Sequence, residues 1–137
     1  MALVRVGLVA LVSLVGACSR ADVDDGIFFP RWSADDAPTA IVGGVLVERD
    51  GCLFLRSGGT EALALWEDGY GFEEGSLIDS SGEPVAGIGA TIHGGGGYGS
   101  DRAWAEGLVG EPIPDRCIPE GVEAFVLIYD VEPGPPG

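Results

Sequence analysis

The sequence has no lysine, asparagine or glutamine and only one histidine. All seven basic residues are arginines that stand singly along the chain, whereas 22 residues are acidic, so the formal net charge is −15. A protein that binds nucleic acid needs clustered Lys and Arg to displace the counterions of the phosphate backbone. This charge balance argues against nucleic acid as a partner and favours solubility.

Familiar motifs of catalysis and ligand binding are also absent. The sequence has no Gly-x-Ser-x-Gly nucleophile motif and no Cys-x-x-Cys pair. Its tetraglycine, residues 94–97, lacks the Lys and Ser/Thr of a phosphate-binding loop, and we interpret it as a flexible turn. The acidic run 22–25 begins like a calcium loop, but Phe and Pro at 28–30 stand where such a loop needs ligands. We therefore expect neither a bound metal nor a cofactor.

The longest uninterrupted apolar stretch lies near the start of the chain. Residues 6–17 are apolar apart from Ser13 and follow a single positive charge at Arg5, as in the apolar region of a secretory signal. A permanent membrane span needs about 20 apolar residues, and the acidic run 22–25 follows too soon for that. We interpret residues 1–17 as a signal peptide.

This apolar stretch ends in Val15, Gly16, Ala17 and Cys18, a pattern that resembles the lipobox of bacterial lipoproteins. The resemblance covers residues 1–18 and implies that Cys18 carries diacylglycerol on its sulfur and becomes the new N-terminus. Several acyl chains, palmitate among them, would anchor the protein where one chain does not. We expect an extracytoplasmic lipoprotein of the cell envelope, held by Cys18 to the cell membrane or an outer membrane. An ordinary secretory signal is the alternative.

The mature chain would hold one domain. Cleavage after residue 17 leaves 120 of the 137 residues, with 6 Arg against 22 carboxylates and a formal charge of −16. Residues 18–39 are acidic and contain proline, as is typical of a tether. We expect residues 40–131 to form the domain and residues 132–137 to form a disordered tail. The apolar group at 27–32 predicts docking on the domain; insertion into the bilayer interface and partner binding are alternatives.

The domain is expected to be mainly β. Apolar, β-branched runs predict strands at 41–48 and 52–56 around an Asp-Gly turn, and further strands at 62–66, within 84–97 ending at His93, and at 122–131. Residues 67–75 are expected to form an acidic loop. A short helix is expected over 100–108 with Ser100 as its N-cap. This pattern is typical of a small, partly open five-stranded barrel of the oligonucleotide-binding type with one short helix.

The two other cysteines, Cys52 and Cys117, are expected to form a disulfide in an oxidising compartment. Such a bond would close about 65 residues and stabilise the fold by roughly 4 kcal/mol. Metal ligation by the two thiolates is the competing interpretation.

Four short sequences carry a second resemblance, namely Gly44 to Leu55, Gly82 to Gly89, His93 to Tyr98 and Ile113 to Cys117. In this order they look like a small domain of secreted proteins of high-GC bacteria, whose activity is uncharacterised. The resemblance covers residues 40–131, supports the disulfide and implies no chemistry. The missing Lys, Asn and Gln, which use A-rich codons, agree with a GC-rich genome.

The function expected is a non-enzymatic binding or structural module whose partner is the membrane, through Cys18, and an envelope protein or a small ligand. Aromatic residues and the single histidine are the candidate ligand-binding residues, although the aromatics could equally close the ends of a small barrel; the set is Trp66, Tyr70, Phe72, His93, Tyr98 and Trp104. The alternative is a small hydrolase or metal-dependent enzyme that uses His93 and the acids of the 67–74 loop, which requires His93 within hydrogen-bonding distance of two carboxylates.

Overall fold

A computed structural model describes residues 26–33, 37–119 and 123–136. The proposed leader and Cys18 lie outside these ranges. Within them the chain forms short strands, one α-helix and one 3₁₀ turn, which are β1 Arg31–Trp32, β2 Ala40–Arg49, β3 Cys52–Ser57, β4 Thr60–Glu67, β5 Gly71–Glu73, β6 Ser76–Ile78, β7 Pro84–Gly87, β8 Thr91–Gly99, α1 Arg102–Val109, η2 Asp115–Cys117 and β9 Phe125–Pro133.

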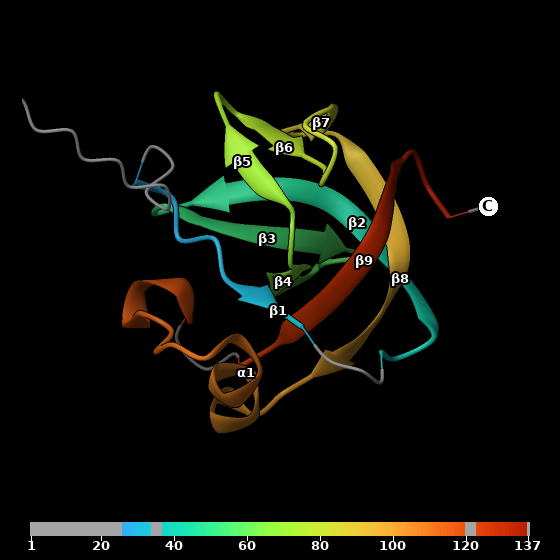
Figure 1. The fold of residues 1–137 in the computed structure, drawn as a ribbon. Coiled ribbons are helices and arrows are strands. Elements are labelled where there is room, and N and C mark those ends of the chain that lie inside the picture. The colour runs from blue at the N-terminus through green and yellow to red at the C-terminus, as the bar shows by residue number, and fades with distance from the viewer. Residues whose placement is uncertain (1–25, 34–36, 120–122, 137) are drawn as a thin grey trace, which may run out of the picture.

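The larger sheet closes on itself. Its strand order is β1-β4-β3-β2-β8-β9, and β4 also pairs with β9 in parallel, so β2, β3, β4, β8 and β9 form a ring of hydrogen-bonded strands (Figure 1). Closing a sheet removes its free edges, which otherwise invite pairing with other chains. The expected mainly β fold with one short helix is confirmed, and the ring is consistent with the expected partly open five-stranded barrel.

Both faces of several strands are buried. Side chains inside the ring, such as Leu53, Leu55 and Ala64, belong to one apolar cluster. Phe54, Leu63 and Leu65, which alternate with them, belong to a second cluster under α1 and the 113–118 segment. Because successive side chains of a strand point to opposite faces, β3 and β4 need apolar residues at nearly every position. This explains the nearly continuous apolar runs of the sequence.

One end of the ring is closed by aromatic packing. Phe29 stacks on Trp66 with ring centroids 5.3 Å apart and lies 6.5 Å from Phe72 of β5. The small sheet β5-β6-β7 lies at this end (Figure 1). Trp32 of β1, which pairs in parallel with β4, donates from its indole nitrogen to the Leu65 carbonyl at 2.9 Å. The apolar group at 27–32 therefore docks on the domain and completes its core.

One loop assignment and one strand assignment made from the sequence are wrong in detail. Residues 71–73 and 76–78 pair as strands β5 and β6, although 67–75 was expected to be an acidic loop. The segment 84–97 is divided between β7 and β8, and β8 continues past His93 through the whole tetraglycine to Gly99. The tetraglycine is thus a strand in the ring and not a flexible turn.

The glycines of β8 permit close approach of other groups. A Cβ atom on Gly96 would overlap the carbonyl oxygen of Leu127, and one on Gly95 would lie 2.6 Å from the Tyr129 ring. A Cβ on Gly97 would lie 2.9 Å from Pro38, whose carbonyl accepts a 2.7 Å hydrogen bond from the Tyr129 hydroxyl. Glycine in a strand marks such close approaches, and here the neighbours fill the space that side chains would occupy.

The N-cap of the helix also differs from expectation. Asp101, not Ser100, caps α1, and its carboxylate accepts from the amide of Ala103 at 3.3 Å. The carboxylate satisfies an amide that has no partner within the helix. The expected helix is otherwise present, and it ends at Gly110 in a left-handed conformation.

The disulfide between Cys52 and Cys117 joins the start of β3 to η2, with an S–S distance of 2.01 Å. Both cysteines are buried in the cluster that lies outside the ring. Within the described ranges no group of three His, Cys, Asp or Glu residues could hold a metal ion. The expected disulfide is confirmed, so the sulfur atoms of Cys52 and Cys117 are bonded to each other and are not free thiolates that could bind a metal.

We expect Gly96→Ala to lower the free energy of unfolding by about 2 kcal/mol, because the added methyl group must displace the Leu127 backbone. Gly107→Ala is the matched control, since Gly107 lies within α1 and a Cβ there meets nothing within 4 Å. That substitution should stabilise the protein by about 0.5–1 kcal/mol, because alanine is the better helix former. Urea unfolding measures both, and equal effects would contradict this account of β8.

We expect reduction of the disulfide to lower the free energy of unfolding by about 2–4 kcal/mol, since the bond constrains a sequence separation of 65 residues in the unfolded chain. Thermal unfolding with and without reductant measures the loss. A variant with both Cys52→Ala and Cys117→Ala is the control, and its stability should not change with reductant. An equal response of this variant would assign the effect to another cause.

Candidate functional site

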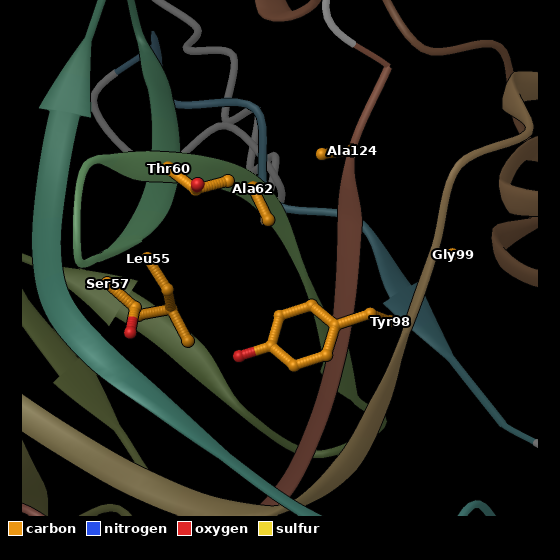
Figure 2. A pocket seen from close by; sticks show the side chains of 7 residues that line it. All are labelled: Leu55, Ser57, Thr60, Ala62, Tyr98, Gly99 and Ala124. Carbon is orange, nitrogen blue, oxygen red and sulfur yellow. The ribbon is translucent and has the colours of Figure 1, made fainter.

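A cavity opens at the end of the ring opposite the aromatic closure. Its volume is about 360 Å³. Most of its wall is formed by the C-terminal end of β3, the N-terminal end of β4 and the C-terminal end of β8 (Figure 2). The lining residues are Leu55, Ser57, Thr60, Ala62, Tyr98, Gly99 and Ala124. We call this cavity the barrel mouth.

The mouth is hollow because the side chains at this end are small. Ala62 and Ala124 line it from β4 and from the residue before β9, and Gly99 contributes no side chain. At the other end of the same strands, Trp66 and Ile128 are fully buried and fill the interior. A small barrel is normally packed with side chains. The gradient in side-chain size leaves the interior unfilled at the end where Ala62, Gly99 and Ala124 lie.

The mouth combines an apolar floor with hydroxyl groups. Leu55 and Ala62 are buried and form the apolar part, whereas Ser57, Thr60 and Tyr98 carry hydroxyls that both donate and accept hydrogen bonds. The Tyr98 ring points across the opening towards Leu55 (Figure 2), and 59% of this tyrosine is exposed.

Charged residues border the mouth but do not line it. The Glu61 carboxylate lies 2.5 Å from the Arg49 guanidinium and 3.9 Å from that of Arg56. Glu123, next to Ala124, accepts from the backbone amide of Arg102 at 3.3 Å. These charges are engaged with one another or with the helix start, so the cavity itself presents no ion to a ligand.

The structure divides the aromatic residues singled out from the sequence. Trp66, Tyr70 and Phe72 are buried in the core at the closed end, where they pack with Phe29 and Leu77. A ligand at the surface does not reach them without rearrangement. Their position matches the alternative given above, that these aromatics close an end of the barrel.

Tyr98 and Trp104 lie at the opposite end from those three. Tyr98 lines the mouth. Trp104 of α1 is 37% exposed and covers the other face of β8, where a Cβ on Gly99 would overlap its ring. Only Tyr98 of the singled-out residues therefore faces the cavity. No sequence motif marks the other lining residues, which are small or apolar and separated by up to 69 positions, from Leu55 to Ala124.

His93 lies within β8, opposite Gly43 of β2 and Glu132 of β9. Its Nδ1 is 2.8 Å from the Gly134 carbonyl oxygen, and its Nε2 is 3.7 Å from a carboxylate oxygen of Glu132. The backbone carbonyl is within hydrogen-bonding distance of the ring, and the carboxylate is not. The acids Glu67, Asp68, Glu73 and Glu74 are not among these polar partners, so the arrangement of His93 with two carboxylates is not seen among the described residues.

A shallower hollow of about 250 Å³ lies on the β5–β7 sheet and includes Glu73 and Glu74. Beside it, the turn between β6 and β7 is ordered by Asp79, whose carboxylate accepts from the amide of Glu83 at 3.0 Å and from the hydroxyl of Ser81 at 2.8 Å. These hydrogen bonds, first that of Glu83, lower the pKa of Asp79. This turn contributes Gly82 to the lining of the hollow.

At the closed end, the Tyr70 hydroxyl accepts a 3.0 Å hydrogen bond from the buried amide of Val131. Burial raises the pKa of this phenol above its usual value of 10.0, and the hydrogen bond from Val131 opposes the shift. The Arg31 side chain donates to the Tyr70 carbonyl at 2.7 Å and lies 4.8 Å from the centre of the Phe29 ring. Tyr70 thus joins β9 to the N-terminal segment.

The comparisons with known proteins add no relative. No protein-family model matches the chain, and neither a curated protein nor a solved structure matches it. In the parts of the chain that the structure describes, α1 is short and no helix has the length and apolar character that crossing a membrane requires.

We expect the stability of the protein to fall above about pH 10 because of Tyr70. The folded state favours its neutral form, so the stability that it contributes is present below the unfolded pKa and is lost as the pH rises through the folded one. Tyr70→Phe should reduce this fall, although it also leaves the Val131 amide without its acceptor and so costs about 1–3 kcal/mol at neutral pH. Urea unfolding from pH 7 to 11 measures both effects.

The control for this measurement is Tyr98→Phe, which alters a tyrosine that is 59% exposed. Its unfolding free energy should follow the wild-type pH dependence. If Tyr98→Phe and Tyr70→Phe changed the alkaline slope equally, burial of Tyr70 would not be the cause.

Proposed function

We propose that this chain is a lipid-anchored extracytoplasmic module that binds a ligand at the barrel mouth and performs no catalysis itself. The anchor is Cys18, and the module is the domain built around the five-stranded ring. The proposal combines the lipobox-like sequence at 15–18 with the cysteine pairing and the mouth.

The cysteine pairing is the observation that carries the extracytoplasmic part. The chain has three cysteines, and two of them form a buried disulfide. Disulfides persist in oxidising compartments outside the cytoplasm. The remaining thiol stands at the end of the apolar leader, where lipid attachment requires a free cysteine. The leader and the disulfide thus support one location from independent residues.

Ligand binding has more support than catalysis. The mouth is concave, mostly apolar and fringed by a few hydroxyls, which are the general properties of a small-molecule site. The enzyme alternative needs an acid–base pair and a bound nucleophile or water. His93 is hydrogen-bonded to a backbone carbonyl, its nearest carboxylate is 3.7 Å away and 72% exposed, and no further catalytic group joins them among the polar partners described.

We expect mass spectrometry of the protein from its native membrane to find an N-terminus at Cys18 that carries diacylglycerol. Cys18→Ala should remove the added mass completely, because the thioether has no sulfur on which to form. Ser19→Ala is the matched control and should remain acylated. An intact leader or an unmodified Cys18 in the wild-type protein would refute the anchor.

A further inference from the structure

We propose that the barrel mouth binds an uncharged molecule with an aromatic ring or a short aliphatic body and one or two hydrogen-bonding groups. This inference rests on the proposed function, because it names the ligand class of the same site. The size, the charge and the hydrogen-bonding groups of the mouth support it.

The size of the mouth limits the ligand. A volume of about 360 Å³ is at the small end of ligand sites, which range from about 300 to 1,000 Å³. The space does not continue into the ring, because Val42, Val126 and Leu46 are buried and fill the interior. The mouth therefore accepts one ring or a short chain and does not enclose a polymer.

The lining selects against ions. None of the seven lining residues carries a charge at neutral pH. An ion that enters must give up hydration, and this is costly unless a paired charge or hydrogen bonds replace the water. Glu61, the nearest acidic residue of β4, is engaged with Arg49 and Arg56. The net charge of −15 opposes anions in addition.

The polar groups of the mouth define the rest of the ligand. Ser57 and Thr60 flank the turn between β3 and β4, and the Tyr98 hydroxyl approaches the same cavity from β8 (Figure 2). Three hydroxyls suit a neutral alcohol, ether or amide, because each can donate or accept. The half-exposed Tyr98 ring offers a face for stacking, which favours an aromatic ligand.

The test uses three probes of one size and different charge, namely benzyl alcohol, benzoate and benzylammonium. Amide chemical shifts of the whole mature chain, residues 18–137 with Cys18→Ser so that no lipid competes, follow each titration. We expect saturable binding of benzyl alcohol with the largest shifts at Leu55, Ala62 and Tyr98. Benzoate and benzylammonium should bind at least ~10-fold more weakly, which corresponds to about 1.4 kcal/mol.

Two variants test the site itself. Ala124→Phe should fill the cavity, and Tyr98→Ala should remove the aromatic ring that lines it. Each substitution should weaken benzyl alcohol binding at least ~10-fold. Ile88→Ala is the matched control, because Ile88 is an apolar side chain, 44% exposed, that does not line the mouth. Its affinity should equal that of the wild type. Thermal unfolding establishes that each variant is folded before its titration is interpreted.

Several outcomes would overturn the proposal. They are no saturable binding of benzyl alcohol, binding of either ion with equal affinity, shifts centred away from the mouth, and unchanged affinity in both folded mouth variants. Dimerisation through the mouth, detected by sedimentation, would also overturn it, because the mouth would then bind a second copy of the chain and not a small molecule. These titrations use protein without lipid, so they do not depend on the anchor at Cys18. If mass spectrometry found no lipid on Cys18 while benzyl alcohol still bound, the anchor would fail and the ligand class would stand. If Cys18 carried lipid while benzyl alcohol did not bind, the ligand class would fail and the anchor would stand.

Discussion

The structure depends on the close contact between β8 and its two neighbours in the ring. β8 pairs with β2 on one side and β9 on the other, and without it the ring has no closure. Gly96 lies against the Leu127 carbonyl, a position that no side chain can share. Glycine loses more conformational entropy on folding than other residues, so the strand must be stabilised by its partners. Its neighbours Tyr129, Pro38 and Trp104 cover the open positions.

The two ends of the ring differ in the size of the side chains that fill them. At one end Phe29 stacks on Trp66 and on Phe72, which lie 37 and 43 positions further along the chain, so this packing needs the N-terminal segment. At the other end Ala62, Gly99 and Ala124 provide too little volume to fill the interior. The barrel mouth therefore follows from the small side chains at this end, and Tyr98 is the large side chain that β8 places there.

Much of the fold could be predicted because its signals are local. Apolar β-branched runs and the Asp50-Gly51 turn predicted β2 and β3, and both form with that turn between them. The tetraglycine was misinterpreted because glycine has a low intrinsic preference for strands. What makes it a strand is non-local, since Tyr129 and Pro38 occupy the space beside it. Contacts across 30 or more positions leave no pattern in a window of the sequence.

The site was less predictable than the fold for a related reason. Residue type pointed to aromatics, but burial decides which aromatic can meet a ligand, and burial is set by closure of the ring. Trp66 and Tyr98 look equivalent in the sequence, yet one is fully buried and the other 59% exposed. Trp66 is near the C-terminal end of β4 and Tyr98 near that of β8. These strands run in opposite directions with β9 between them, so the two side chains lie at opposite ends of the ring. In a closed sheet, the side chains available for binding are those that border space which the core does not fill. Here they are the small residues and hydroxyl groups around Tyr98.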